Sequence, residues 1–523
     1  MKKSILIVSL ALLSISVFGQ ENVSGYVFED LNGNNKKDKN ERGIADVAVS
    51  NGINVTKTDQ SGKYTLDLAE DQMIFLIKPS GYDIPTDQNN LPQFYYNHKP
   101  SGSPKELKYQ GVAATGTLPK SVDFALKPGK QTNEQFRMLV FGDPQPYNLK
   151  EVEFFSKGVV SEVEGIENVS FGIALGDLVG DDLSLYPDYI KAIQKIGIPW
   201  YSVMGNHDQN YDVKEDRLTD ETFESHFGPA TYAFNHGKVH FIVLENILYP
   251  DPRDGQGYWG GLREDQLKFV ENNLKLVPKD HLVVVFMHIP IFEELGDSFR
   301  DEDRTKLLEL LSPFANSVSL SAHTHYMRQT FWGKEEGFSG QRPHHHFNIG
   351  TPSGDWYSGK MTESGLPAST MRDGSPNGYV FMDFDGNNYT TAYKAAGKPE
   401  NYQIEVFAPK LVRKGQRTTA SIVANFFMGA NTDTVRYRIG KSEWKNMVNF
   451  EGLDPTYLLE VYQWDTADKL PEGRRPSNPF PTDHLWRAAV PTDLPTGEHS
   501  IEIEAIDMFG KKHYTTRTIT VID

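Results

Sequence analysis

Five short apolar runs in this 523-residue chain each end in a residue that can bind a metal ion or a phosphate. A run of β-branched and aromatic residues that stops at a polar turn is typical of a buried strand entering a loop. The polar residues at these five ends are Asp143-Pro144-Gln145, Asp177, Asn206-His207-Asp208, His288 and His323-Thr324-His325. Ligands bind at the carboxyl ends of the strands in open α/β sheets. The pattern therefore predicts one site built from five separate loops, because chance explains five such coincidences poorly.

The first 19 residues have the order of a secretory signal. Lys2 and Lys3 precede an apolar run over residues 4–18, and the small residue Gly19 follows it. We expect cleavage after Gly19 and an exported protein, in the periplasm, on the cell surface or in the medium. A membrane anchor is the alternative, but the run is short for a span, which takes roughly 20 residues. No later stretch is apolar enough to cross a bilayer, so we expect no transmembrane segment in the mature chain.

Composition restricts the partners of the chain. The net charge is −17 and there is no cysteine. An acidic protein is poorly suited to nucleic acid as its main partner, although a local cationic site can still bind phosphate. Without disulfides, each domain depends on its own core or on metals. The length suggests about three domains, and the oligomeric state is not predicted.

The first domain is expected over residues 22–127 as a small β-domain with a calcium-type loop. Oxygen side chains occupy positions 1, 3, 5, 9 and 12 of the loop, and position 7 offers its carbonyl; these residues are Asp30, Asn32, Asn34, Asp38, Glu41 and Lys36. This is the ligand spacing of an EF-hand loop, with Asn35 at the position usually held by glycine. The loop and its flanking strands resemble the calcium-stabilised B-type repeats of bacterial surface adhesins, which implies a structural calcium ion. A solvated polar turn is the alternative.

The other two domains differ in their periodicity. Residues 135–393 alternate strands with helical patterns at 151–163, 186–196, 263–276 and 303–311, which predicts βαβ units. A hairpin pattern over residues 232–244 makes the sheet mixed. Residues 394–523 alternate apolar and polar positions, with proline-rich turns such as 471–481 between the runs, which predicts an antiparallel β-sandwich.

The order Asp-x-x, Gly-Asp-x-x-x-Asp, Gly-Asn-His-Asp, His, Ala-His-x-His resembles the calcineurin-like metallophosphoesterases. The flanking regions resemble a three-domain bacterial subgroup with family N- and C-terminal domains. The resemblance implies an α/β (α+β) four-layer core with mixed sheets, flanked by the small N-terminal β-domain and the C-terminal β-sandwich. The first block departs from the usual Asp-x-His: it reads Asp143-Pro144-Gln145, a variant that a branch of the family carries.

The resemblance also implies a ligand set for two divalent transition-metal ions, manganese, iron or zinc. Asp177 would bridge the two ions. Asp143 and His325, with Gln145 as a weaker oxygen ligand, would complete one site, and Asn206, His288 and His323 the other. His207 would donate a proton to the leaving oxygen. Asp181 and Asp208 fall inside the motifs without a ligand role, and we expect Asp208 to orient His207 or a ligand.

Other candidates lie outside the motifs. Trp356 and Tyr357, and also Tyr258 and Trp259, could line the cleft, and packing in the core explains them equally well. The cluster His344-His345-His346 is interpreted as the start of a strand, with metal binding as the less favoured alternative.

The predicted function is hydrolysis of a phosphomonoester or phosphodiester by an exported metallophosphoesterase. Its substrate would be a small-molecule or a glycan- or lipid-linked phosphate ester. The alternative is a non-catalytic cell-surface adhesion or glycan-binding protein with a degenerate phosphoesterase core. The variant Gln145 and the flanking domains favour that alternative, whereas the complete set of ligand residues argues against it.

Overall fold

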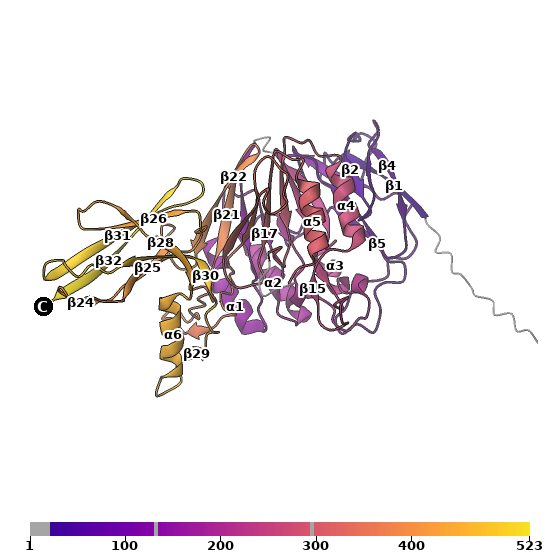
Figure 1. Ribbon diagram of the computed structural model, residues 1–523. Coiled ribbons are helices and arrows are strands. Elements are labelled where there is room, and N and C mark those ends of the chain that lie inside the picture. The colour runs from indigo at the N-terminus through magenta and orange to yellow at the C-terminus, as the bar shows by residue number, and fades with distance from the viewer. Residues whose placement is uncertain (1–20, 130–133, 293–297) are drawn as a thin grey trace, which may run out of the picture.

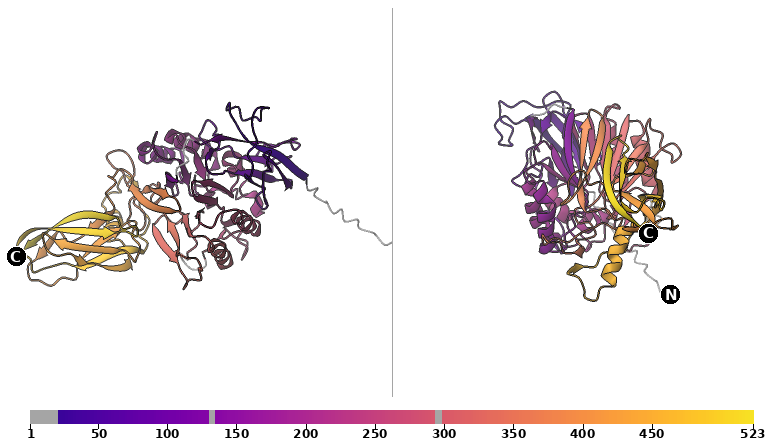
Figure 2. Two further views of the ribbon diagram at one scale, coloured as in Figure 1. Left: turned by 90° about the horizontal axis from the view of Figure 1, so that it is seen from above. Right: turned by 90° about the vertical axis from the view of Figure 1, so that its left-hand side faces the viewer.

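The computed structural model describes residues 21–129, 134–292 and 298–523. The molecule is elongated, with the N-terminal β-domain at one end and the C-terminal β-domain at the other (Figures 1 and 2). The expected signal sequence, residues 1–19, lies outside the described residues. Within the described ranges, no helix has the length and apolarity needed to cross a membrane.

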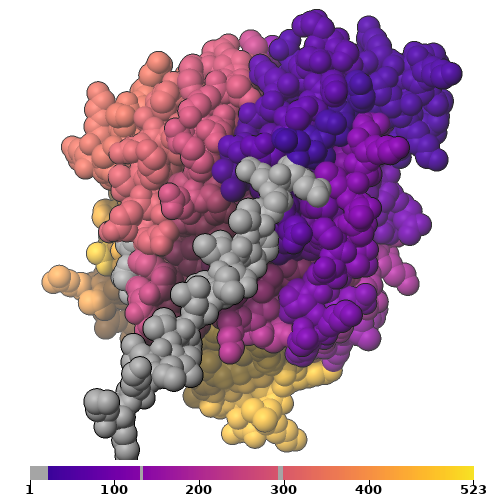
Figure 3. Space-filling model, turned by 90° about the vertical axis from the view of Figure 1, so that its right-hand side faces the viewer, coloured from indigo at the N-terminus to yellow at the C-terminus, as the bar shows by residue number. Residues whose placement is uncertain are grey.

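The N-terminal domain consists of two four-stranded sheets, in the orders β4-β1-β8-β6 and β3-β2-β5-β7. The strands are β1 (Glu21–Glu29), β2 (Ala48–Ser50), β3 (Val55–Lys57), β4 (Lys63–Leu68), β5 (Gln72–Ile77), β6 (Tyr82–Asp83), β7 (Tyr95–His98) and β8 (Phe124–Pro128). The core of this domain continues into the central domain, where the rings of Phe75 and Phe269 lie 5.5 Å apart. The broad contact between the two domains is visible in Figure 3.

The central domain is built on two sheets that share one apolar core. One has the order β11-β10-β9-β21-β22 and the other the order β12-β13-β16-β17-β19-β18. The strands are β9 (Gln135–Phe141), β10 (Phe171–Ala174), β11 (Trp200–Ser202), β12 (Tyr232–His236), β13 (Val239–Val243), β16 (Leu282–Phe286), β17 (Asn316–Ser321), β18 (Arg328–Trp332), β19 (His344–Asn348), β21 (Gly378–Asp385) and β22 (Asn388–Ala395). Strands β9 to β11 are parallel, as are β13, β16, β17 and β19, and β21 runs antiparallel to β9.

Helices cover the outer faces of both sheets. The helices of this domain are α1 (Leu149–Gly158), α2 (Tyr186–Ile193), α3 (Glu221–Phe227), α4 (Glu264–Leu274) and α5 (Asp301–Leu311). Helices α1 and α2 bury Phe155 and Tyr189 against Phe141 of the first sheet, whereas α4 and α5 pack on the second (Figure 1). The expected mixed-sheet, four-layer core is confirmed. The hairpin expected over residues 232–244 is β12–β13.

The C-terminal domain is a sandwich of two sheets, β23-β25-β30-β28 and β24-β32-β31-β26-β27. Its strands are β23 (Ile404–Phe407), β24 (Leu411–Arg413), β25 (Ser421–Phe426), β26 (Thr434–Ile439), β27 (Lys445–Asn446), β28 (Val448–Gly452), β30 (Thr482–Ala489), β31 (Gly497–Ile506) and β32 (Lys512–Ile522). The predicted β-sandwich is confirmed, and most of its strand pairs are antiparallel. Strands β24 and β32 pair in parallel, and the domain contains helix α6 (Pro455–Asp465).

Helix α6 begins with recognisable capping residues. The side chain of Asp454 accepts a hydrogen bond from the Tyr457 amide, and Pro455 occupies the first turn. Both are typical of a helix start. The helix and the two-residue strand β29 (Gly473–Arg474) lie on the side of the sandwich that faces the central domain, where β29 pairs with β20 (Gly359–Lys360) (Figure 1).

Candidate active site

The strand order brings the five predicted loops to one place. Asp143, Asp177 and the 206–208 turn follow the adjacent strands β9, β10 and β11, and His288 and the 323–325 turn follow the adjacent strands β16 and β17. All seven predicted metal ligands lie in this cluster. Six of them are buried, and His323 is partly exposed.

One half of the cluster is formed around His325. Its Nδ1 hydrogen-bonds to the carbonyl oxygen of Gly354, and a carbonyl can only accept, so Nδ1 carries the proton. Nε2 therefore presents its lone pair to Gln145 Oε1 at 2.8 Å and to Asp143 Oδ2 at 3.1 Å. Asp143 is fully buried, and within the described ranges its Oδ2 has no hydrogen-bond partner.

The other half is formed around His288 in the same way. Its Nδ1 donates to the Leu175 carbonyl at 2.8 Å, so Nε2 faces Asn206 Oδ1 at 2.9 Å and Asp177 Oδ1 at 3.3 Å. His323 Nδ1 lies 3.2 Å from the same Nε2. Asp177, His288 and His323 form a group in which one ligand atom from each lies within 4.8 Å of the others.

These donor sets fit divalent metal ions. In both halves a nitrogen lone pair faces oxygen lone pairs in a buried space, and a cation between them would stabilise this arrangement. Imidazole, carboxylate and amide oxygen suit zinc, iron or manganese. The carbonyls of Leu175 and Gly354 orient the two imidazoles, as partners of metal-binding histidines do.

Asp177 lies between the two halves. Its Oδ1 accepts the backbone N–H of His207 at 2.9 Å, and its Oδ2 accepts from Gln145 Nε2 at 3.0 Å. Gln145 thus connects Asp177 to His325. This position agrees with a bridging role for Asp177, and Gln145 takes part in both halves.

The motif glycines are required by close packing. A Cβ atom at Gly205 would lie 2.1 Å from the Asp177 backbone nitrogen, and one at Gly176 would lie 2.6 Å from His288 Nδ1. Neither distance leaves room for any side chain. The backbone is also strained at this site, where Gln145, Asp177, Asp181, His323, His325, Trp356 and Tyr357 all have positive φ. Such strain concentrates at functional sites.

His207 lies beside the cluster, with a side chain that is 26% exposed. Its Nδ1 is 2.6 Å from Asp181 Oδ1, and its Nε2 is 4.0 Å from Asp177 Oδ2. Burial lowers the pKa of His207, but the charges of Asp177 and Asp181 outweigh it and raise that pKa to about 9. Because Asp181 holds Nδ1, a protonated imidazole would have its second N–H available at Nε2.

Asp208 was expected to orient His207 or a metal ligand, and its hydrogen bonds agree with the second role. Asp208 is buried and accepts hydrogen bonds from the backbone N–H groups of Leu178 and Gly205 and from the Tyr186 hydroxyl. It fixes the two loops that carry Asp177 and Asn206, whereas Asp181 contacts the imidazole. Burial and the nearby charge of Asp177 raise the pKa of Asp208 to about 7.

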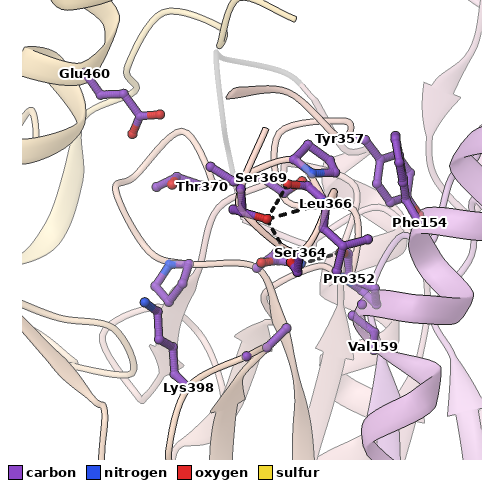
Figure 4. Close-up of a pocket in the computed structure, with 18 of the residues that line it drawn as sticks. Phe154, Val159, Pro352, Tyr357, Ser364, Leu366, Ser369, Thr370, Lys398 and Glu460 are labelled. Atoms are coloured by element: carbon purple, nitrogen blue, oxygen red, sulfur yellow. Dashed lines mark hydrogen bonds between the residues drawn. The ribbon is translucent and has the colours of Figure 1, made fainter. Parts of the chain in front are cut away.

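The aromatic candidates take different positions. The ring of Trp356 stacks on His325 with centroids 4.1 Å apart, and Tyr258 lies edge-on to His323 at 6.2 Å. Tyr258 and Trp259 line a pocket of about 240 Å³ together with His323. Tyr357 does not line the cleft: it is buried, and its hydroxyl donates to the Pro144 carbonyl. It faces a second cavity, of about 510 Å³, between α1, the 352–377 loop and the C-terminal domain (Figure 4).

The histidine cluster forms β19, as interpreted from the sequence. His344 and His346 are held by serine hydroxyls of the neighbouring strand β17, at distances from 2.7 to 2.9 Å. Burial lowers the pKa of His344 to about 3. These rings are neutral core side chains.

The calcium-type loop folds around its own oxygens. Asp30 accepts the N–H groups of Gly33 and Asn35, and Glu41 accepts those of Leu31 and Asp38. Asn35 has φ 58°, the conformation expected at this position. The amides of Asn32 and Asn34 both donate to Asp38 Oδ2. Within the described ranges, the carboxylates of the loop do not converge as closely as the Asp177 group does.

Two contributors were missed at the level of sequence. Gly354 supplies the carbonyl that orients His325, and the Tyr147 ring lies 5.9 Å from His207, edge-on. Tyr147 is only two residues from Gln145, so its position in the same loop could have indicated that it lies near the site. The role of Gly354 depends on a contact across 29 residues and has no local signal.

The comparisons with known proteins agree with this geometry. Profiles of three families match the chain: "Calcineurin-like phosphoesterase" over residues 136–327, "N terminal of Calcineurin-like phosphoesterase" over 30–113 and "C terminal of Calcineurin-like phosphoesterase" over 346–513. The chain belongs to the calcineurin-like phosphoesterases and has the N- and C-terminal domains that accompany that core.

Individual relatives are distant. A probable glycerophosphodiester phosphodiesterase, GpdQ, of Arcobacter nitrofigilis is 25% identical over 166 residues, 31% of this chain and 58% of that protein. A probable cyclic nucleotide phosphodiesterase of Xenorhabdus bovienii is 21% identical over 173 residues, 32% of this chain and 66% of that protein. The chain thus spans less than two thirds of these curated relatives. The purple acid phosphatase PPD1 of yellow lupin (Lupinus luteus) aligns with a TM-score of 0.39, at 14% identity over 67% of each chain.

Proposed function

We propose that this chain is a metal-dependent phosphoesterase that cleaves a phosphate ester with water. The observation that carries the proposal is the pairing of two buried imidazole lone pairs with the oxygens of Asp143, Gln145, Asp177 and Asn206, beside His207. A protein released from catalysis would have no reason to keep this arrangement.

The ligands divide into two sets that share Asp177. Asp143, Gln145 and His325 would hold one divalent ion, and Asn206, His288 and His323 the other. When bound, manganese, iron or zinc ions supply positive charge for the phosphate oxygens and lower the pKa of water to give a nucleophile. Asp177 faces both sets, so one carboxylate can serve both ions.

His207 is the proton donor in this proposal. Asp181 holds Nδ1, which leaves Nε2–H as the proton that faces the substrate. The hydrogen bond to Asp181 favours the protonated ring. A positioned imidazolium can protonate the leaving alkoxide, a contribution worth roughly 10²–10⁴-fold in rate.

A small-molecule phosphodiester is the substrate class best supported. Both curated relatives are named as phosphodiesterases. A monoester, or an ester linked to a glycan or lipid, would use the same site chemistry. The experiment below distinguishes a diester from a monoester.

Two further properties belong to the proposal. Residues 1–19 would direct export, on the basis of their charged, apolar and small-residue order. The loop from Asp30 to Glu41 would bind a structural calcium ion, because its side-chain oxygens follow the EF-hand spacing and Asn35 adopts the required left-handed conformation.

The proposal is tested with the mature protein, bis(4-nitrophenyl) phosphate and 4-nitrophenyl phosphate, with added manganese or zinc. We expect metal-dependent hydrolysis, faster for the diester, which Asp177→Asn abolishes. His207→Ala should change it little, because nitrophenolate leaves without a proton. Metal content is measured in parallel. Absence of turnover together with absence of bound metal would contradict the proposal and favour a non-catalytic binding protein.

A further inference from the structure

Both flanking domains are fixed to the central domain by buried polar contacts. In the C-terminal domain, His484 Nε2 lies 3.1 Å from Asp373 Oδ2. In the N-terminal domain, Lys99 Nζ lies 2.7 Å from Glu221 Oε1 of α3. All four side chains are buried. Lys99 begins a segment, residues 99–112, through which the N-terminal domain also contacts the loops of the candidate active site.

The 99–112 segment is hydrogen-bonded to the loop that carries His207. The Tyr109 carbonyl oxygen accepts from Thr222 Oγ1 of α3 at 3.2 Å. The same Thr222 hydroxyl accepts from Asn210 Nδ2 at 2.8 Å, and the Thr222 backbone N–H donates to Asn210 Oδ1 at 2.9 Å. Asn210 lies three residues beyond His207, and both Asn210 and Thr222 are buried. These bonds fix the Tyr109 backbone beside the loop of the proposed proton donor.

The side chain of Tyr109 contacts a second loop of the site. Its hydroxyl donates to the backbone carbonyl oxygen of Asp181 at 3.1 Å. Asp181 is the residue whose Oδ1 lies 2.6 Å from His207 Nδ1. One partly buried tyrosine of the N-terminal domain is therefore connected to both of the loops that meet at His207.

Asp181 occupies the centre of a tight turn. The Asp182 N–H donates to the Gly180 carbonyl at 2.8 Å, and Asp181 has φ 63°. A turn closed over three residues with a positive φ at its centre is a γ-turn of the rare, strained form. Such a conformation persists only when surrounding contacts hold it. The Gly180 N–H donates to the Pro146 carbonyl at 2.9 Å, and the Tyr109 hydroxyl binds the carbonyl of the central residue.

The Asp181 carboxylate depends on this turn for its direction. Its side chain is 57% exposed, so burial does not hold it against His207. If the turn relaxes, an exposed carboxylate can rotate into water, and Nδ1 of His207 then loses the partner that fixes the ring.

We propose that Tyr109 is a positioning residue of the active site, supplied by the N-terminal domain. Its hydroxyl holds the turn that directs the Asp181 carboxylate to Nδ1 of His207, and this leaves Nε2 facing the leaving oxygen. The inference rests on the proposed phosphoesterase function. It assigns the N-terminal domain a role in the reaction that is separate from its calcium-type loop.

The proposal can be separated from a merely structural role by the choice of leaving group. Nitrophenolate leaves without a proton, whereas the more basic phenolate gains from one. Loss of the Tyr109 hydroxyl should therefore slow release of phenolate more than release of nitrophenolate. A change that only weakens the fold or the metal site would slow both equally.

The test compares hydrolysis of methyl phenyl phosphate and methyl 4-nitrophenyl phosphate by the full-length mature protein with manganese. Tyr109→Phe, Asp181→Asn and the double variant are compared with wild type. Tyr64→Phe is the matched control, because its hydroxyl also donates to a backbone carbonyl within the N-terminal domain, that of Val122, at 2.7 Å. Hydrogen exchange of the Asp182 amide, measured without metal, gives a result that does not depend on turnover.

We expect Tyr109→Phe to slow methyl phenyl phosphate about three- to tenfold more than methyl 4-nitrophenyl phosphate, since one neutral hydrogen bond contributes about this much. Exchange of the Asp182 amide should become faster, because the turn is less well held. The double variant should be no slower than Asp181→Asn alone, because the hydroxyl acts through that carboxylate. Tyr64→Phe should keep the wild-type ratio of the two rates and the wild-type exchange.

Three results would overturn the assignment: equal effects of Tyr109→Phe on the two esters, an additive loss in the double variant, or unchanged exchange of the Asp182 amide. A wild type that cleaves only the nitrophenyl ester would also overturn it, because no donor would then assist the leaving group. Turnover of methyl 4-nitrophenyl phosphate with any of these results defeats the role of Tyr109. Absence of both turnover and bound metal defeats the proposed function itself.

Discussion

His240 provides a quantitative test of the packed core, far from the metal ligands. Its Nδ1 is 2.8 Å from Asn235 Oδ1, and its Nε2 is 2.7 Å from Asn273 Nδ2. The ring is buried between β13 and α4 with an amide hydrogen aimed at Nε2, so it is held neutral. Burial, assisted by the charge of His281, lowers the pKa of His240 to about 3.

The sign of the pH effect follows from this shift. The unfolded state takes up a proton near pH 6.5, whereas the folded state does so only near pH 3, so acidification within this window favours unfolding. The stability that the neutral ring contributes is complete above pH 6.5 and is lost as the pH falls toward 3. At about 1.4 kcal/mol per pH unit, His240 alone lowers the free energy of unfolding by about 2 kcal/mol between pH 6.5 and pH 5.

The assay compares wild type with His240→Gln, which retains amide hydrogen bonding but does not titrate. Free energies of unfolding are measured in urea at pH 7.5, 6.5, 5.5 and 5.0, at constant metal and calcium concentration. We expect the variant to be less stable at pH 7.5 and the difference to shrink by about 2 kcal/mol at pH 5. If the two proteins lose stability in parallel, His240 is not a neutral buried histidine and the reasoning fails.

Three further predictions concern the sites. Gly205→Ala should lower the metal content at least tenfold, because the added Cβ would collide with the Asp177 backbone. Metal analysis compares this variant with wild type and with the control Gly440→Ala, where the added Cβ meets no atom within 4 Å. Asp181→Asn should slow hydrolysis of an alkyl ester about 10- to 100-fold but spare a nitrophenyl ester, whose leaving group needs no proton; equal losses would count against His207 as the donor. Asp38→Ala should abolish calcium binding in calorimetry and the rise in melting temperature on adding calcium. If the variant still responds to calcium, the loop from Asp30 to Glu41 is not the calcium site.

The sequence predicted what local patterns encode. The change from apolar to polar residues at the end of β9, β10, β11, β16 and β17 is a local signal, and it located all the predicted ligands. What it could not show was the direction of side chains that follow strained turns. Asp181 has φ 63°, and this left-handed turn brings its carboxylate to His207, a role that the sequence suggested for Asp208.

Adjacent residues can also have side chains in different environments. Trp356 and Tyr357 both have positive φ, yet the first stacks on His325 and the second is buried with its hydroxyl on Pro144. Helix α6 was missed because the surrounding alternation of apolar and polar residues favoured strands, although Asp454 and Pro455 marked its start. The pairing of Gly359 with Arg474 joins segments that are far apart in the chain and have no common local signal.

The buried contact of His484 with Asp373 has a consequence for how the protein can be divided. Asp373 also accepts the backbone N–H of Met327, two residues beyond His325, so removal of the C-terminal domain would expose a charge next to the 323–325 turn. The two parts should therefore behave as complementing fragments. The chain would be divided within residues 396–403 and the two fragments produced as separate polypeptides. On mixing, they should reassociate and recover the metal binding that the catalytic fragment lacks alone. This recovery should increase with fragment concentration, because it requires the two fragments to bind each other.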